Sequence, residues 1–272
     1  MTTSSSVPYS YLFVPGDRND RYGKACSSAA DAVIIDLEDA VAPDNKKTAR
    51  EKVEQWLNNG GKAHVRINGA DTQWFIEDLR LLNAPGLQGV MLPKAEDPEP
   101  IQIIVSSVRE STPVVLLIET AQGMLRAPEL ARLPGVSRLA FGSVDFQLDC
   151  GIPDDDMGLA YARAQLVIAS AAARLAPPVD GVTTVLEDID VLRRETDRAR
   201  RLGFGGKLCI HPRQLDVVNE GFAASPEDVA QAREILEVVA ASGSQGAARH
   251  KGKLIDRPIF EWAKRIMARH EP

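Results

Sequence analysis

Pro113-Val-Val-Leu-Leu-Ile-Glu119-Thr120 indicates the architecture of this chain when it is read together with Leu139-Ala-Phe-Gly-Ser-Val-Asp145. Each is a short apolar run bounded by Pro or Gly, too short for a helix and typical of a buried parallel strand. Glu119 directly follows the first run, and Asp145 follows the second after a short loop. The acids are 26 residues apart, a separation that suits a βαβ unit of about 30 residues. Two carboxylates at the same ends of neighbouring strands are expected to converge, which predicts a site for a hard divalent ion such as Mg²⁺.

Candidate strands alternate with helical patterns along most of the chain. Eight such units in about 210 residues favour a closed (β/α)₈ barrel, a TIM barrel of the α/β class. A doubly wound open sheet is the alternative, weakened because no GxGxxG turn follows the first strand. The predicted strands are residues 11–14, 32–36, 63–67, 89–93, 114–119, 138–141, 179–182 and 207–210, and the clearest predicted helices are residues 49–57, 74–82, 158–175, 188–202, 226–241 and 259–268.

Length and composition limit the organisation of the chain and its classes of partner. The 272 residues are enough for one α/β barrel or for two small domains. We expect a barrel at residues 1–222 and a C-terminal helical segment at residues 223–272. A net charge of −6 gives no support to binding of nucleic acid or an anionic membrane. The start of the chain is polar and no apolar run approaches a membrane span, so a cytoplasmic protein is expected.

Cysteine and histidine usage argues against disulfides and zinc. Cys26, Cys150 and Cys209 are odd in number and lack CxxC spacing, which is typical of reduced, buried thiols. The four histidines are scattered without ligand spacing. His211 precedes Pro212, a pattern that first indicates a helix start and leaves a catalytic role as the alternative.

Polar residues follow most of the predicted strands at their carboxyl ends, where barrels of this type place the active site. Glu119 and Asp145 are the candidate metal ligands, and helix capping is the alternative for each acid taken alone. A bound divalent ion would polarise the oxygens of a 2-oxo or 2-hydroxy acid. The other members of this set are Arg18, Asp36, Glu38, Asp39, Arg66, Asn68, Lys94 and His211.

The basic residues at and near these strand ends have two interpretations each. Arg66 is suited to bidentate binding of a carboxylate or an enolate oxygen, and an ion pair with Glu38 or Asp39 is an alternative that can hold at the same time. Arg18, Arg21 and Lys24 form either a solvated face or a site for a phosphate-bearing cofactor. Lys94 can join that cluster or pair with an acid.

Six motifs in fixed order carry a resemblance to a known family. The chain closely resembles the citrate lyase β-subunit-like acyl-CoA lyases of the HpcH/HpaI aldolase/citrate lyase superfamily, over residues 10–268. The resemblance implies a TIM barrel that forms a homotrimer or hexamer, with Mg²⁺, or alternatively Mn²⁺, at Glu119 and Asp145. It also implies Arg66 on the reacting oxygens and Phe13, Arg18 and Lys24 along a CoA thioester. The motifs are Tyr11-Leu-Phe-Val-Pro-Gly16, Ile35-Asp-Leu-Glu-Asp-Ala-Val41, Val65-Arg-Ile-Asn68, Met91-Leu-Pro-Lys94, Ile118-Glu-Thr120 and Cys209-Ile-His-Pro212.

The tail carries a further part of the resemblance. Gly252-Lys-Leu-Ile-Asp256-Arg-Pro258 resembles the lid motif of CoA-dependent members. This implies that residues 223–272 pack on a neighbouring subunit and that Asp256 is the acid or base at the acetyl methyl carbon. From the residues alone, Asp256 is expected near a helix N-terminus, because Pro258 follows it. The compact tail leaves the choice of substrate open.

The expected reaction is cleavage of a 3-hydroxyacyl-CoA to acetyl-CoA and a 2-oxo acid, or the reverse condensation. Citramalyl-CoA is the first choice of substrate and malyl-CoA the second. Arg66 would stabilise the thioester enolate, Asp256 would protonate its carbon, and Glu38, Asp39 or water would take the hydroxyl proton. Two alternatives stay open: a CoA-independent, metal-dependent aldolase of free 4-hydroxy-2-oxo acids, and a citrate lyase β subunit acting on citryl-acyl-carrier protein.

Overall fold

The computed structural model describes residues 7–242, 248–250 and 253–270, which belong to two compact units. One unit comprises Pro8–Phe222, and the other contains the residues from Ala223 onwards. Gly252 of the tail motif lies outside the described residues. No helix among the described residues is long and apolar enough to cross a membrane.

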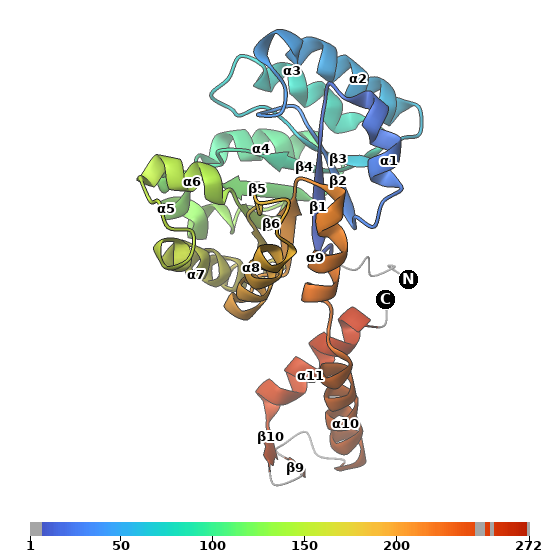
Figure 1. Ribbon diagram of the computed structural model, residues 1–272, viewed down its shortest axis with the longest axis vertical. Helices are drawn as coiled ribbons and strands as arrows, with labels where there is room; N and C mark the ends of the chain where they lie inside the picture. The colour runs from blue at the N-terminus through green and yellow to red at the C-terminus, as the bar shows by residue number, and fades with distance from the viewer. Residues whose placement is uncertain (1–6, 243–247, 251–252, 271–272) are drawn as a thin grey trace. The chain divides into compact units, whose positions relative to one another are not determined.

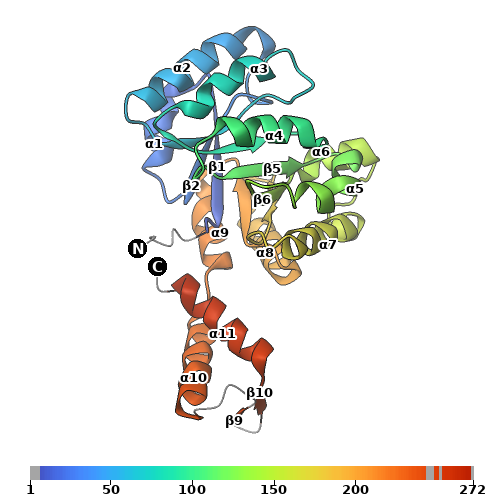
Figure 2. The same cartoon turned by 180° about the vertical axis from the view of Figure 1, so that it is seen from behind.

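The first unit is a closed barrel of eight parallel strands in sequence order, surrounded by helices (Figures 1 and 2). β1 closes the barrel by pairing with β8, with Ser10 opposite Lys207. The predicted (β/α)₈ barrel is therefore confirmed, and each predicted strand overlaps an observed one. The strands are β1 Ser10–Pro15, β2 Ala32–Asp36, β3 Ala63–Arg66, β4 Leu87–Leu92, β5 Val114–Ile118, β6 Val136–Phe141, β7 Val179–Asp180 and β8 Gly206–Cys209.

The helices match the predicted pattern where the apolar periodicity is long and depart from it where it is short. Residues 74–82, expected as one helix, form the short α3 followed by a 3₁₀ turn, and the chain becomes extended at Ala84 because Pro85 follows. The helices of this unit are α1 Tyr22–Cys26, α2 Lys46–Asn58, α3 Phe75–Asp78, α4 Pro98–Ser107, α5 Ala121–Leu130, α6 Ser143–Cys150, α7 Met157–Ala172, α8 Ile189–Leu202 and α9 Leu215–Phe222, with 3₁₀ helices at Asn19–Arg21, Pro43–Asn45, Leu79–Asn83 and Pro212–Gln214.

Alternation along each strand divides the apolar core into two layers. On β3, Ala63 and Val65 join the layer between the strands and the helices. His64 points the other way and meets the ring of Tyr11 edge-on at 5.9 Å. Apolar side chains such as Leu117 and Leu208 form the separate inner layer. Because side chains fill the inside of the barrel, open space for a ligand is left at its rim.

Cysteine exposure differs from the expectation. Cys209 on β8 is buried, but Cys26 and Cys150 are exposed, so the prediction of buried thiols is wrong for two of the three. Both exposed cysteines are the last residues of short helices, α1 and α6, where the chain leaves the core. The three thiols are free, as expected.

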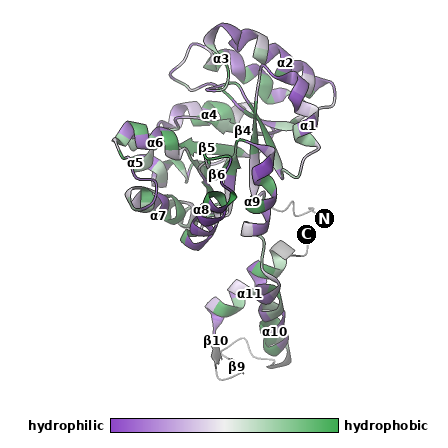
Figure 3. Ribbon diagram, in the orientation of Figure 1, coloured by the Kyte–Doolittle hydropathy of each residue, from purple (hydrophilic) through white to green (hydrophobic). Residues whose placement is uncertain are grey.

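The second unit is a helical hairpin with a small antiparallel ribbon. It contains α10 Pro226–Ser242, β9 Ala248–His250, β10 Lys253–Ile255 and α11 Arg257–His270. Ala232, Ile235, Ile255 and Ala263 form its buried apolar cluster, and Figure 3 shows hydrophobic and hydrophilic residues alternating along both helices. Asp256 precedes α11, and its Oδ1 accepts a hydrogen bond from the N–H of Ile259 at 3.2 Å. Asp256 thus lies at a helix N-terminus, as its position before Pro258 predicted.

Candidate active site

Arg66 is fixed by acids from the neighbouring strand. It ends β3 directly opposite Asp36, the last residue of β2. Its Nε and Nη2 donate to the two carboxylate oxygens of Asp36 at 2.7 and 2.6 Å. Its Nη1 lies 3.0 Å from Oε2 of Glu38 and 3.7 Å from Oδ2 of Asp39. The predicted ion pair is therefore present, but its main partner is Asp36, to which the sequence had assigned no role.

Phe13 on β1 contacts the same guanidinium. The centre of the Arg66 guanidinium lies 4.8 Å from the centre of the Phe13 ring, a distance typical of a cation–π contact. The Arg66 side chain is nearly buried, with an exposed fraction of 10%. A group held at its edges by carboxylates and on one face by a ring has little freedom to move.

Glu119 follows β5 and is buried. Its Oε1 accepts the backbone N–H of Lys94 at 2.7 Å, and no hydrogen bond within the described part of the chain uses its Oε2. A Cβ added at Gly142 would lie 2.4 Å from that Oε2, so the glycine keeps the space beside the oxygen open. Thr120 caps α5 by accepting from the N–H of Gly123, which removes helix capping as the role of Glu119.

Asp145 was expected after a short loop; Gly142 alone separates β6 from α6, and Asp145 lies on the first turn of that helix. The structure brings it into one pocket of about 370 Å³ with Glu119 and Arg66. In the described residues no group of three or more His, Cys, Asp or Glu side chains is arranged to hold a metal ion. Two carboxylates are a common protein contribution to a Mg²⁺ site, in which water and substrate oxygens supply the other ligands. The pocket is also lined by Phe13, Asp36, Asp39, Leu117, Phe141, Ser143, Val182, Thr184, Leu208 and Ile210.

Burial and the crowding of like charges raise the pKa of three carboxyl groups at this site. Burial raises the pKa of Glu119 to about 8, while Arg66 opposes the shift and Glu38 adds to it. Burial likewise raises the pKa of Glu38 to about 7, again against the effect of Arg66. The pKa of Asp145 is also raised, by burial first and by Asp39 second. Several acids share one guanidinium, so a divalent cation would relieve the excess negative charge.

Residues expected along a CoA chain do not all gather at this pocket. Arg18 pairs with Asp20 at 2.9 Å and is exposed, and Lys24 is exposed on α1. Neither side chain lines the pocket. Lys94 places its Nζ 3.8 Å from Oε1 of Glu38 and lines a smaller hollow of about 120 Å³ beside Asp71 and Glu96.

His211 has a structural role in this fold. Its Nδ1 accepts a hydrogen bond from the N–H of Arg213 at 3.1 Å. The side-chain oxygen of Gln214 accepts one from the backbone N–H of His211. These reciprocal bonds form a capping box at the 3₁₀ helix that precedes α9. The helix-start interpretation of His211-Pro212 is confirmed.

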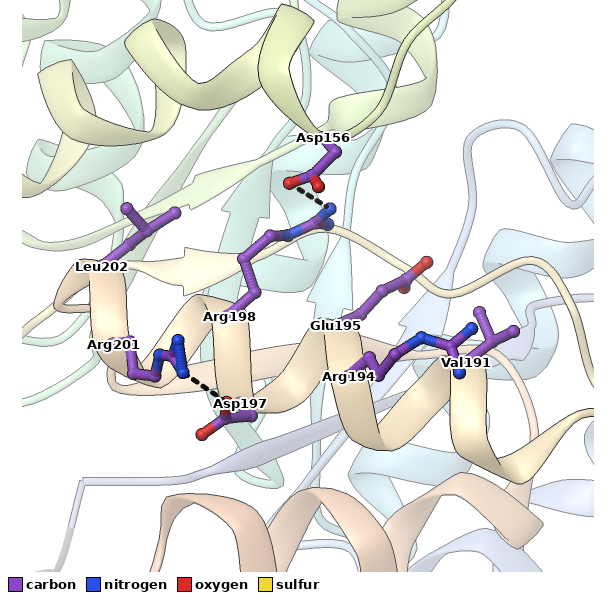
Figure 4. A pocket seen from close by; sticks show the side chains of 8 residues that line it. All are labelled: Asp156, Val191, Arg194, Glu195, Asp197, Arg198, Arg201 and Leu202. Atoms are coloured by element: carbon purple, nitrogen blue, oxygen red, sulfur yellow. Dashed lines mark hydrogen bonds and ion pairs between the residues drawn. The ribbon is translucent and has the colours of Figure 1, made fainter.

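A larger hollow of about 560 Å³ lies along α8, and none of the candidate strand-end residues lines it (Figure 4). It is lined by equal numbers of arginines and acids, and two of the arginines pair with acids of the lining. Arg198 lies 3.4 Å from Asp156, and Arg201 lies 3.4 Å from Asp197. Size therefore does not identify the site, because the chemistry of the smaller pocket is more specific.

The model of the HpcH/HpaI aldolase/citrate lyase family matches residues 9–212. The chain belongs to this family. A second model, the C–C bond lyases of the TIM-barrel fold, matches residues 162–271. The resemblance seen in the sequence is thus confirmed, and this member of the HpcH/HpaI aldolase/citrate lyase family is a carbon–carbon lyase.

This chain is similar to curated relatives and to solved structures over almost its whole length. A citrate lyase subunit beta-like protein of Deinococcus radiodurans is 34% identical over 286 residues, covering 100% of both chains. A (3S)-malyl-CoA thioesterase of Cereibacter sphaeroides is 34% identical over 96% of this chain and 94% of its own. The structure of CitE from Mycobacterium tuberculosis with magnesium, acetoacetate and coenzyme A is 30% identical, with a TM-score of 0.82, over 98% of this chain and 100% of that one.

In this HpcH/HpaI family member, the sequence did not predict the roles of two residues, Asp36 and Lys46. Asp36 was visible as a strand-end acid, but its place opposite Arg66 depends on the register of β2 against β3, which the sequence did not reveal. Lys46 carried no signal of its role. It is buried on α2, and its Nζ donates to the carbonyls of Leu37 and Glu38, both at 2.7 Å. It therefore holds the turn that carries Glu38.

Proposed function

We propose that this chain is a Mg²⁺-dependent lyase, with Mn²⁺ as an alternative ion, that cleaves a 3-hydroxyacyl-CoA to acetyl-CoA and a 2-oxo acid, or catalyses the reverse. The observation that supports this most is the meeting of Glu119, Asp145 and the fixed Arg66 in one pocket. The donors fit the ion: both are hard carboxylates, and Gly142 leaves room beside Oε2 of Glu119. CitE of M. tuberculosis carries magnesium and coenzyme A, which supports the same ligands here.

The residues of this chain would divide the reaction among them. When bound, Mg²⁺ supplies Lewis acidity at the carboxylate and hydroxyl of the 2-hydroxy acid end. Glu38 or Asp39 would take the hydroxyl proton: Asp39 lines the pocket, and burial raises the pKa of Glu38 to about 7, close to the working pH. Arg66 is aimed by Asp36 at the oxygen where the thioester enolate develops its charge. Asp256 would then protonate the enolate carbon in the cleavage direction and remove that proton in the condensation.

The pocket lining supports citramalyl-CoA as the first choice of substrate. Its cationic side chain is Arg66, which already faces Asp36 and Glu38, and apolar side chains such as Leu117 and Leu208 line the pocket beside the acids. A methyl group finds apolar partners there, whereas the second carboxylate of a citryl substrate would lack a cation. Malyl-CoA is the second choice, because one methyl group is worth only about 1–3 kcal/mol of discrimination.

Cofactor contacts and assembly complete the proposal. Phe13, Arg18, Lys24 and Lys94 are proposed to contact the CoA thioester. The protein is proposed to be a cytoplasmic homotrimer or hexamer that uses no nucleic acid or membrane partner. Residues 223–272 would pack as a lid on a neighbouring subunit.

The decisive experiment incubates the purified full chain with citramalyl-CoA and Mg²⁺, with and without EDTA, and measures pyruvate and acetyl-CoA. Pyruvate that appears only with the metal supports the proposal, and Glu119→Gln serves as the matched inactive control. Activity of the chain alone on a CoA thioester rules out dependence on an acyl-carrier protein. If the chain cleaves free 4-hydroxy-2-oxo acids but no CoA thioester, it is a CoA-independent aldolase and the proposal is wrong.

A thioesterase is the second candidate, because one relative bears that name at 34% identity. Hydrolysis of malyl-CoA releases a free CoA thiol and malate, whereas cleavage of its carbon–carbon bond gives acetyl-CoA and glyoxylate. A thiol reagent and a glyoxylate assay on the same reaction separate the two. Thiol release without glyoxylate would favour the thioesterase.

A further inference from the structure

Lys94 has an unusual backbone for a residue with a side chain. Its φ is 45°, in the left-handed region, and within the described ranges Arg174 is the other non-glycine residue with a positive φ. A Cβ in this region is crowded by the following carbonyl, so such a conformation persists only where its surroundings impose it, often at functional sites. Lys94 follows β4 at the rim of the barrel, beside the candidate metal pocket.

The left-handed turn directs two successive N–H groups toward β5. Lys94 donates its N–H to Oε1 of Glu119 at 2.7 Å, and Ala95 donates its N–H to the carbonyl of Leu117 at 3.2 Å. In an extended strand, successive N–H groups point in opposite directions. The positive φ is therefore what allows one residue to bond the main chain of β5 while its neighbour bonds the carboxylate at the end of the strand.

This bond defines which oxygen of Glu119 remains for a ligand. Oε1 is used by Lys94, while Oε2 faces the space that Gly142 keeps open. If the N–H of Lys94 turned away, the carboxylate would lose the bond that fixes its plane, and its free oxygen would no longer be held toward that space. The Lys94 side chain acts elsewhere, with Nζ 3.8 Å from Oε1 of Glu38.

We infer that Lys94 is a positioning residue that orients the candidate metal ligand Glu119 through its left-handed backbone. The inference rests on the proposed function for its metal site. Backbone and ammonium have separable effects: the backbone sets the affinity for the divalent ion, and the ammonium acts on Glu38 and hence on turnover. Metal affinity should therefore follow the ability of residue 94 to adopt a positive φ, whatever the charge of its side chain.

The test compares replacements at this position by their affinity for Mn²⁺ alone, measured by titration calorimetry on the full chain without substrate. Lys94→Asn and Lys94→Gly tolerate the left-handed region, whereas the β-branched Lys94→Val does not. We expect Asn and Gly to retain wild-type affinity within about threefold, and Val to lose about tenfold or more, as replacing a partner that orients a ligand typically does. All three lack the ammonium, so a common loss of kcat is expected.

Controls separate the failure of this inference from that of the proposed function. Arg174→Val places the same strain at an exposed position after α7, and it should lower stability while leaving Mn²⁺ affinity unchanged. If Lys94→Val does not fold, Lys94→Ala should still bind Mn²⁺ more weakly than Lys94→Asn. Equal affinities of Ala, Val and Asn would overturn the inference. Equal affinities of wild type and Glu119→Gln would instead overturn the metal site itself.

Discussion

Asp36 and Arg66 form a buried pair in which both oxygens of the carboxylate are used. Asp36→Asn keeps the shape but removes one charge, leaving the guanidinium without its main partner. Breaking a buried pair in this way costs about 3–5 kcal/mol, so we expect the free energy of unfolding in urea to fall by about that amount. We also expect kcat to fall by at least tenfold, because Arg66 loses its fixed position.

Asp39→Asn is the matched control for that change. Asp39 is 60% exposed and 3.7 Å from Arg66, and exposed pairs of this kind contribute about 0–1 kcal/mol. Its unfolding free energy should stay within that range of the wild-type value. Equal destabilisation by the two substitutions would mean that Asp36 is not the residue that holds Arg66.

The shifted carboxyl groups predict how stability depends on pH. Burial raises the pKa of Glu119 from an ordinary value of 4.5 to about 8, so the folded metal-free protein keeps a proton that the unfolded chain has lost. At Glu119 the folded state binds more protons between these two values, so the contribution of this group to stability falls as pH rises through that window. We expect the Tm in EDTA to decrease from pH 5 to pH 8.

Added Mg²⁺ should reverse this trend. The ion requires the ionised carboxylate, so its affinity should increase with pH up to about 8 and its stabilising effect should grow in parallel. Thermal unfolding at each pH, with Mg²⁺ and with EDTA, measures both effects. A Tm difference that is independent of pH would show that Glu119 does not bind the ion.

At the residue level the sequence predicted that Glu119 and Asp145 lie close together, but it did not predict which acid pairs with Arg66. Glu119 and Asp145 follow apolar runs of neighbouring strands, and spacing alone places such acids together. Asp36, Glu38 and Asp39 lie within four residues, and only the register of β2 against β3 decides which one faces Arg66. Register depends on contacts that are distant in sequence, so a single sequence could not select Asp36.

Helix α2 supports the site through one buried lysine. Lys46 donates to the carbonyls of Leu37 and Glu38, and burial lowers its pKa. Lys46→Met fills a similar volume but leaves two carbonyls without a donor, at a cost of about 1–3 kcal/mol for each unsatisfied group. We expect lower stability and a lower kcat, because the turn that carries Glu38 loosens, while Mn²⁺ affinity stays near the wild-type value.

Lys47→Met provides the comparison on the same helix. Lys47 is exposed, so its removal should change the free energy of unfolding by no more than about 0.5 kcal/mol. Denaturant unfolding and steady-state kinetics on both variants check the prediction. A Lys46→Met enzyme with unchanged kcat would show that the turn needs no support from α2.

Strands and helices differ in how well their sequences predicted them. Six of the eight strands end at, or directly before, a Pro, a Gly or an acid, so the limits of the strands were predicted within a few residues. α6 has eight residues, from Ser143 to Cys150, and no clear apolar periodicity, so the sequence did not predict this helix. Short helices are stabilised mainly by the core they pack on, and that core is formed by residues distant in sequence.

The candidate catalytic and metal-binding residues belong to two different units of the chain. Arg66 and the metal pair belong to the barrel, and Asp256 belongs to the unit that begins at Ala223. We propose that Asp256 acts in the pocket of a neighbouring subunit in a closed oligomer. Arg66→Ala and Asp256→Asn should each remove most turnover, with Asp256→Asn still binding Mn²⁺ and pyruvate as the wild-type enzyme does.

Mixing the two inactive chains tests this arrangement directly. If Asp256 serves the neighbour's pocket, a closed ring assembled at random from equal amounts of both chains restores about a quarter of the wild-type sites, since each needs an intact Arg66 from one chain and an intact Asp256 from the next. The mixture must be unfolded and refolded together, and its kcat compared with separately refolded controls. Light scattering on the same samples confirms the assembly. If Asp256 serves the pocket of its own chain, no mixture can combine both intact groups at one site, and turnover stays at the level of the single variants.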